Sequence, residues 1–338
     1  MHAFTKRNHY NPCFWTGLWN HDYFEARKRG VRTKPAREQH VFALGIRANK
    51  VYPTVVNHVH YAKGLGVAEI TPEAMKQFCQ KRFPDQYEKL ACYVDEHPES
   101  LFMDFEEILA GVEQKGKYDL LIDAAMLGGF SSSEHKGFIT CLLVIHAMRS
   151  YEMMASMVEM SESIGMPKWE YFWLLKNAWA NQFVLARATV ALACARWTLY
   201  RTDDHRFPLC DSPIMMGRDS MMAVLSPRLL VEIDLKVASS EDSWVIRDGI
   251  SFSKYREFRR RSIGNTFREI IFHDPKELEC WRDTPEFKAR LRSLAEPTVA
   301  RQLVADAANR VIWGLNGFGR VPREFESWIK DRVDVKTK

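Results

Sequence analysis

Apolar residues recur at helical spacing along much of the chain, which predicts a mainly helical protein. Stretches with this spacing are residues 71–82, 84–96, 98–112, 135–163, 167–195 and 253–271. Thr71 and Pro72 provide a capping residue followed by a proline at the first helical position. Ser131 and Glu134 have the spacing of a capping box, which predicts the start of the long helix at about residue 135.

Other segments are typical of strands, because they are rich in apolar and β-branched residues and are bounded by proline or glycine. They lie at residues 40–46, 53–60, 197–200, 221–225 and 229–234. Together with the helices they predict an α+β fold, predominantly helical, with one small mixed or antiparallel sheet built from residues 40–60 and 197–235.

We expect two parts in the chain, an α+β core domain over residues 1–274 and a helical C-terminal extension over residues 275–338. The extension contains apolar residues at helical spacing that need a surface to pack against. They are Leu303, Val304, Ala307, Val311 and Ile312.

Composition limits the classes of protein to consider. The 338 residues are 46% hydrophobic and carry a formal net charge of +5, so an anionic partner is allowed but not required. The seven cysteines form no CxxC pair, which indicates reduced thiols and a cytoplasmic protein. The apolar segment 183–200 contains Arg187 and Arg196, which argues against a membrane span, and we expect no membrane partner.

Several familiar sites are absent from the sequence. It contains no GxxxxGK[ST], GxGxxG, HExxH or GxSxG motif, which excludes most nucleotide-dependent enzymes, zincins and α/β-hydrolases. His58 and His60 have the spacing of a ligand pair on one strand face, but no third ligand lies nearby, so no metal site is predicted. The sequence identifies neither a cofactor nor an oligomeric state.

Polar residues in apolar surroundings mark a candidate catalytic site. His9 lies in an Asn-His-Tyr run before Pro12, Asp211 opens an Asp-Ser-Pro turn, and Arg149 follows a long apolar run. We expect His9, Arg149 and Asp211 to lie close together, since each needs a polar partner inside the protein. His9 would act as the acid or base, Asp211 would orient it, and Arg149 would stabilise negative charge.

The same three residues support a second hypothesis, in which they form an internal polar tie that holds the N-terminal segment on the helical core. Asp-Ser-Pro is ordinary turn chemistry, and a buried arginine often serves only as a structural partner. Exposure discriminates between the two hypotheses: an open cleft favours catalysis, and a sealed cluster with satisfied hydrogen bonds favours the tie.

An arginine-rich segment suggests contact with an anion. Arg256, Arg259, Arg260, Arg261 and Arg268 fall within one predicted helix. Such a cluster is either a solvated helix face or a stripe that follows phosphates. The candidate substrate-binding residues are Asn8, Tyr10, Asn265, Arg256 and Arg260, and the candidate partner is nucleic acid or another anionic substrate.

The same polar positions carry a resemblance to a known family. They are Asn8, His9, Tyr10 and Pro12, Arg149 after its apolar run, Cys210-Asp211-Ser212-Pro213, Leu225-Ser226-Pro227, and Asn265 before residues 270–272. In this order they resemble the domain-of-unknown-function family 4238, over residues 6–274. Cys210 stands where that family usually has serine. The resemblance implies the place of a site but no activity.

Combining these observations, the sequence predicts a nuclease-like hydrolase that acts on a phosphate-containing substrate. The alternative is a non-catalytic structural or protein-interaction protein in which His9, Arg149 and Asp211 form the polar tie.

Overall fold

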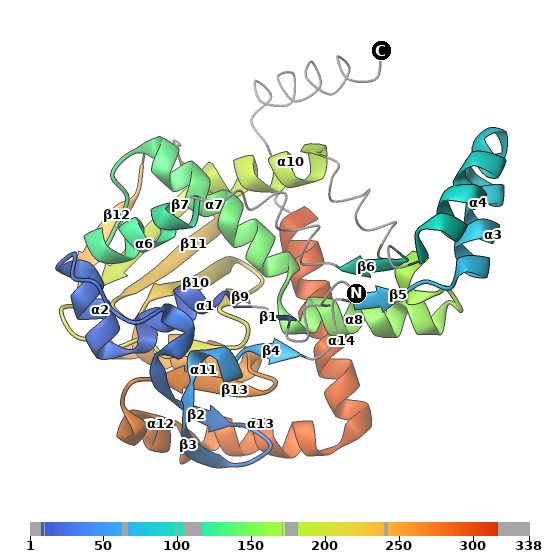
Figure 1. The fold of residues 1–338 in the computed structure, drawn as a ribbon. Coiled ribbons are helices and arrows are strands. Elements are labelled where there is room, and N and C mark those ends of the chain that lie inside the picture. Colours follow the sequence, from blue (N-terminus) through green and yellow to red (C-terminus); the bar gives the residue numbers. More distant parts are fainter. Residues whose placement is uncertain are drawn as a thin grey trace.

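The computed structural model describes residues 8–9, 11–62, 67–98, 101–104, 117–170, 172, 182–239 and 243–316. The fold is α+β, as predicted, with helices packed around two sheets rather than one (Figure 1).

The larger sheet has five strands in the order β12-β7-β11-β10-β9. Their bounds are β7 Ala195–Arg201, β9 Ile214–Met216, β10 Ser220–Ser226, β11 Leu229–Ala238 and β12 Val245–Asp248. Neighbouring strands are antiparallel except for β12, which runs parallel to β7. The strands predicted at residues 197–200, 221–225 and 229–234 are all confirmed here. The run of residues in β10 does not alternate strictly between apolar and polar, because most of its positions are buried.

The smaller sheet has four antiparallel strands in the order β3-β2-β13-β8. Their bounds are β2 His40–Gly45, β3 Lys50–Val55, β8 Leu209–Cys210 and β13 Glu269–Phe272. The prediction of a single sheet is wrong, because β2 pairs with β3 and β13 and not with the strands of the larger sheet. Two short antiparallel pairs complete the strands: β1 Asn8–His9 with β4 Tyr61–Ala62, and β5 Val67–Glu69 with β6 Phe102–Asp104.

Helices cover both sheets. The α-helices are α1 Cys13–Thr16, α2 His21–Lys28, α3 Pro72–Arg82, α4 Tyr87–Glu96, α6 Lys117–Leu127, α7 Ser133–Met148, α8 Tyr151–Ser163, α10 Gln182–Ala193, α11 Phe252–Asn265, α12 Pro275–Arg282, α13 Pro285–Ala295 and α14 Pro297–Asn316. Short 3₁₀ turns are η1 Gly17–Trp19, η2 Ala36–Glu38, η3 Val56–His58 and η4 Pro84–Gln86. In Figure 1, α3 and α4 project from one side of the molecule.

Some predicted helix boundaries are confirmed and others are corrected. Thr71 caps α3 by accepting a hydrogen bond from Ala74 N. The long helix predicted from residue 135 is two helices, α7 and α8, which meet at Arg149 and Ser150. Its cap is Ser132 rather than Ser131. The helix predicted over residues 98–112 is a strand at 102–104, and residues 105–112 lie outside the described residues.

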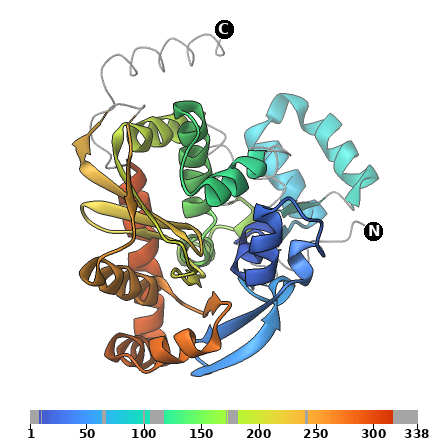
Figure 2. The same ribbon diagram turned by 90° about the vertical axis from the view of Figure 1, so that its left-hand side faces the viewer.

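Helices α12, α13 and α14 contribute to the same hydrophobic core as the sheets. Leu278, Trp281 and Phe287 are completely buried, and Val304 and Val311 are also buried. Figure 2 shows α14 passing behind the strands of the larger sheet. The described part of residues 275–338 is therefore helical and packed against this core. Among the described residues, no helix is both long and apolar enough to cross a membrane.

Candidate functional site

Arg149 connects the N-terminal segment to the helical layer. It caps the C-terminal end of α7, and its Nη2 donates a hydrogen bond to the backbone oxygen of His9 at 2.7 Å. The contact uses the main chain of His9, while the imidazole lies against the sulfur of Cys13 and the ring of Tyr61. The structure therefore brings His9 and Arg149 together through a backbone contact.

Asp211 is completely buried just after β8, and backbone groups satisfy its carboxylate. Phe267 N and Arg268 N donate to Asp211 Oδ2 at 3.0 and 2.6 Å. Burial, and to a smaller extent the neighbouring Glu152, raises the pKa of Asp211 to about 8, although the two N–H groups act in the opposite direction. The carboxylate thus fixes the turn that leads into β13.

Asn11 links the N-terminal segment to the backbone at Asp211. Its side-chain nitrogen donates to the backbone oxygens of Cys210 and Asp211 and to Nδ1 of His60, the last at 3.0 Å. Because Nδ1 accepts this bond, the His60 imidazole is neutral. Burial lowers the pKa of His60 to about 3, which agrees with that assignment.

Glu269 closes the network on its other side. Its carboxylate accepts a hydrogen bond from His60 N at 2.6 Å and another from the Tyr52 hydroxyl at 3.0 Å. His60 has a φ of +52°, a left-handed conformation that is uncommon outside glycine, and this conformation is held by the bond to Glu269. Burial raises the pKa of Glu269. We call Asn11, Tyr52, His60, Asp211 and Glu269 the Asp211 network.

Two further buried charges flank the Asp211 network. Ser212 donates a short hydrogen bond to Glu152, whose pKa is raised by burial. Arg290 donates to the backbone oxygen of Thr266 at 2.9 Å and lies over the ring of Phe267, 4.4 Å from its centroid. Asp211 stabilises the charge of Arg290 electrostatically, although burial lowers the pKa of Arg290 to about 10.

The other predicted site residues are distributed over several places. Asn8 pairs with Ala62 in β1, Tyr10 lies outside the described residues, and Asn265 ends α11 and bonds the backbone of Arg261. Arg256 and Arg260 are exposed on α11.

The prediction for the arginine-rich segment is partly wrong. The helix predicted over residues 253–271 ends at Asn265, so Arg268 is not part of the α11 face. It follows that helix in the turn held by Asp211. This placement puts Arg268 beside Glu269 and Tyr151 instead.

Arg268 lines a cleft of about 410 Å³ next to the Asp211 network, together with Gly45, Arg47, Ala48, Tyr52, Tyr151, Phe267 and Glu269. We call it the Arg268 cleft. A second hollow of about 460 Å³ shares Arg47, Tyr151 and Phe267 with it and adds Arg301. Arg47 and Arg268 are both exposed. The guanidinium of Arg268 lies over Tyr151 at 5.9 Å and donates to the backbone oxygen of Tyr61.

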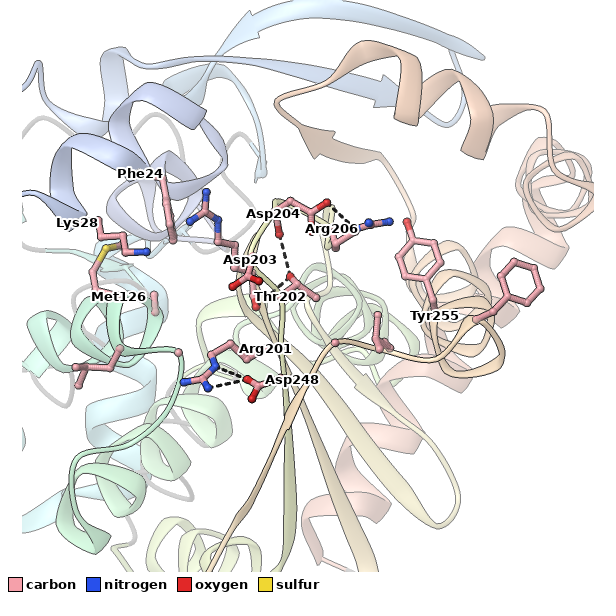
Figure 3. Close-up of a pocket in the computed structure, with 17 residues that line it drawn as sticks. Phe24, Lys28, Met126, Arg201, Thr202, Asp203, Asp204, Arg206, Asp248 and Tyr255 are labelled. Carbon is pink, nitrogen blue, oxygen red and sulfur yellow. Dashed lines mark hydrogen bonds and ion pairs between the residues drawn. The ribbon is translucent and has the colours of Figure 1, made fainter.

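Another cleft, of about 1050 Å³, lies elsewhere and has a different electrostatic character (Figure 3). Arg201 pairs with Asp248 at 2.6 Å, and Arg206 with Asp204 at 2.9 Å. Arg228, which also lines it, pairs with Glu25 at 2.5 Å. Three of its cationic side chains therefore already have carboxylate partners.

One group among the described residues is arranged to hold a metal ion. It consists of His21, His205 and His273, with one ring nitrogen from each lying within 4.8 Å of the others. The pair that sequence spacing singled out is different: His58 is exposed on η3, and His60 is buried in the Asp211 network. The three-histidine cluster has no sequence signal, because its members come from three distant segments.

Sequence reasoning also missed Tyr52, His60 and Glu269 as site residues, and it placed Arg268 on an arginine-rich helix rather than at a cleft. His60 was noted only for its spacing from His58, and Glu269 was assigned to a helix. No protein-family model, curated protein or solved structure matches this chain.

Proposed function

We propose that the protein binds a phosphate-containing ligand in the Arg268 cleft, and that the Asp211 network is the structural support of that cleft. The observation that carries this proposal is the pair of backbone hydrogen bonds from Phe267 and Arg268 to Asp211. They fix the backbone beneath the Arg268 side chain, so the cation is held at the cleft without being part of the sealed interior.

The roles in this proposal follow from burial. Asp211 is completely buried and hydrogen-bonded, so it acts on the ligand only by positioning the 267–268 turn. Arg149 acts on the same structure by holding the backbone of His9. Arg47 and Arg268 supply the planar, permanently charged groups that match phosphate oxygens.

Binding is tested by calorimetric titration of the whole chain with inorganic phosphate and with a short single-stranded oligonucleotide. A charge-assisted hydrogen bond contributes about 1.5–3 kcal/mol, so Arg268→Ala and Arg47→Ala should each weaken binding about 10- to 100-fold. Arg196→Ala is the matched control, because Arg196 is an exposed arginine paired with Asp234 in the larger sheet. Equal affinities in wild type and the Arg268 variant would refute the proposal.

A second candidate, hydrolysis of the bound phosphate ester, is favoured by Glu269. Glu269 lines the cleft beside Arg268, and its raised pKa suits a group that donates a proton to a leaving oxygen. Hydrolysis of bis(p-nitrophenyl) phosphate by wild type, reduced about 100-fold or more in Glu269→Gln, is the expected result. Ligand binding without any turnover would leave binding as the function and exclude this candidate.

A further inference from the structure

The three-histidine cluster lies apart from the Arg268 cleft. His21 is the first residue of α2, His205 lies in the segment between β7 and β8, and His273 directly follows β13. The ring centroid of His205 lies 4.8 Å from that of His21 and 4.7 Å from that of His273. The smaller sheet and the N-terminal helix thus converge on one group of imidazoles.

Two members of the cluster have buried ring nitrogens without a protein partner. Among the residues that the structure describes, neither Nδ1 nor Nε2 of His205 has a hydrogen-bond partner, and the same is true of Nδ1 of His273. His205 is only 9% exposed. A buried polar atom without a partner costs about 1–3 kcal/mol and needs a physical reason. A metal ion that accepts the nitrogen lone pairs supplies that reason.

The backbone around each histidine is held in place. Asn20 caps α2 by accepting from Tyr23 N at 2.7 Å, and its side chain donates to His40 O at 2.8 Å. Arg206 N and Phe207 N both donate to Pro227 O, which fixes the segment after His205. Asp274 caps α12 directly after His273. Ligands on backbone fixed in this way are positioned well for a metal.

Charged groups surround the three-histidine cluster. Arg228 acts electrostatically on both His205 and His273. Arg228 is the nearby cation, but it is paired with Glu25 at 2.5 Å. Asp274 and Glu277 act on His273 with the opposite sign and favour positive charge there.

We propose that His21, His205 and His273 form a binding site for one divalent transition-metal ion, with zinc as the best match. Zinc binds imidazole at about 2.0–2.1 Å, so tetrahedral ligand nitrogens lie about 3.3 Å apart. The three nitrogens lie within 4.8 Å of one another, so binding requires the imidazoles to move closer together. Three protein ligands leave a fourth position, and the exposed side chain of His21 places it toward solvent.

The test measures metal binding directly. The chain is prepared without a polyhistidine tag, stripped with EDTA, dialysed and titrated with Zn²⁺ by calorimetry, and bound zinc is counted by elemental analysis. We expect one ion per chain and a rise in melting temperature, since a ligand that binds only the folded state stabilises it. Absence of saturable one-to-one binding would overturn the proposal.

Variants separate the cluster from adventitious sites. His21→Ala removes an exposed ligand without disturbing the core, and it should weaken zinc binding at least about 10-fold. His205→Phe keeps an aromatic ring against Phe24 and should have the same effect. His58→Ala, an exposed histidine outside the cluster, should bind zinc like wild type. Unchanged affinity in His21→Ala would refute the assignment.

Cysteine thiols are the main competing ligands, since Cys92 and Cys280 are exposed. The Co²⁺-substituted protein distinguishes the two donor types by its absorption spectrum. Visible bands of a nitrogen-ligated ion without a sulfur-to-metal charge-transfer band support the histidine site. A strong charge-transfer band would assign the bound metal to thiolates and contradict the proposal.

Discussion

The Asp211 network and the three-histidine cluster lie at the two ends of the same short strand, β13. Their buried polar groups differ in how far they are hydrogen-bonded. Glu269 opens β13 and accepts two hydrogen bonds, and Asp211 accepts two more from the turn before it. His273 follows β13, and both it and His205 keep buried nitrogens without partners. Burial is common to both regions, whereas hydrogen-bond satisfaction is not.

This difference separates support from ligand binding. A completely buried carboxyl group that accepts hydrogen bonds from backbone N–H groups cannot contact a substrate, so Asp211 organises the main chain. A buried imidazole with open lone pairs retains that capacity, so the histidine cluster is the better place for an external ligand. The predictions below test the two halves of this contrast.

The largest effect is expected when the Asp211 carboxylate is removed. Asp211→Ala leaves the N–H groups of Phe267 and Arg268 buried without an acceptor, which should lower the free energy of unfolding by about 2–5 kcal/mol. Denaturant unfolding measures the change. Asp219→Ala is the control, because Asp219 pairs with Lys236 at the surface, and it should change stability by less than about 0.5 kcal/mol. A decrease in the free energy of unfolding of less than about 1 kcal/mol for Asp211→Ala would refute the structural role of Asp211.

The two regions should give opposite pH dependences of stability. The pKa of Asp211 is raised to about 8 in the folded state, so its contribution is complete below about pH 4 and is lost as pH rises to 8. The pKa of His205 is lowered to about 3, so its contribution is complete above about pH 6.5 and is lost as pH falls toward 3.

Unfolding curves of metal-free protein across this pH range measure both slopes. Asp211→Asn should reduce the loss of stability between pH 4 and 8, and His205→Phe should reduce the loss between pH 6.5 and 3. The contrast is refuted if both variants change the stability in the same pH range.

The smallest effect is expected at the exposed arginines of α11. Arg256→Ala with Arg260→Ala should change stability by less than about 0.5 kcal/mol, because both side chains are exposed. Fluorescence anisotropy with an oligonucleotide should also show wild-type affinity and an unchanged salt slope. A smaller salt dependence of oligonucleotide binding in the double variant would assign the anion site to α11 instead of the Arg268 cleft.

Local signals predicted much of the secondary structure. Thr71-Pro72 located α3, and apolar runs located β7, β10 and β11, because caps and buried strands leave short-range patterns in sequence. Residues 269–271 were misassigned to a helix. Their apolar spacing fits a helix locally, but pairing with β2 and β8 determines their conformation.

The candidate site was predictable only where polar residues stood out from apolar neighbours. Asp211 and Arg149 had that contrast, and both are buried polar residues in the structure. Glu269 and the three histidines had no such signal, since their partners come from distant segments. Their roles depend on tertiary contacts that no spacing rule contains.

The long reach of the N-terminal segment has a consequence during protein synthesis. Asn11 bonds the backbone at 210 and 211, Trp19 donates to Phe207 O, and Trp15 donates to Leu225 O. At translation rates of about 5–20 residues per second, these acceptors emerge from the ribosome about 10 to 40 s after their donors. Until then the two indoles lack these hydrogen-bond acceptors, so the packing of the N-terminal segment is completed only after residues 207–225 have been synthesised.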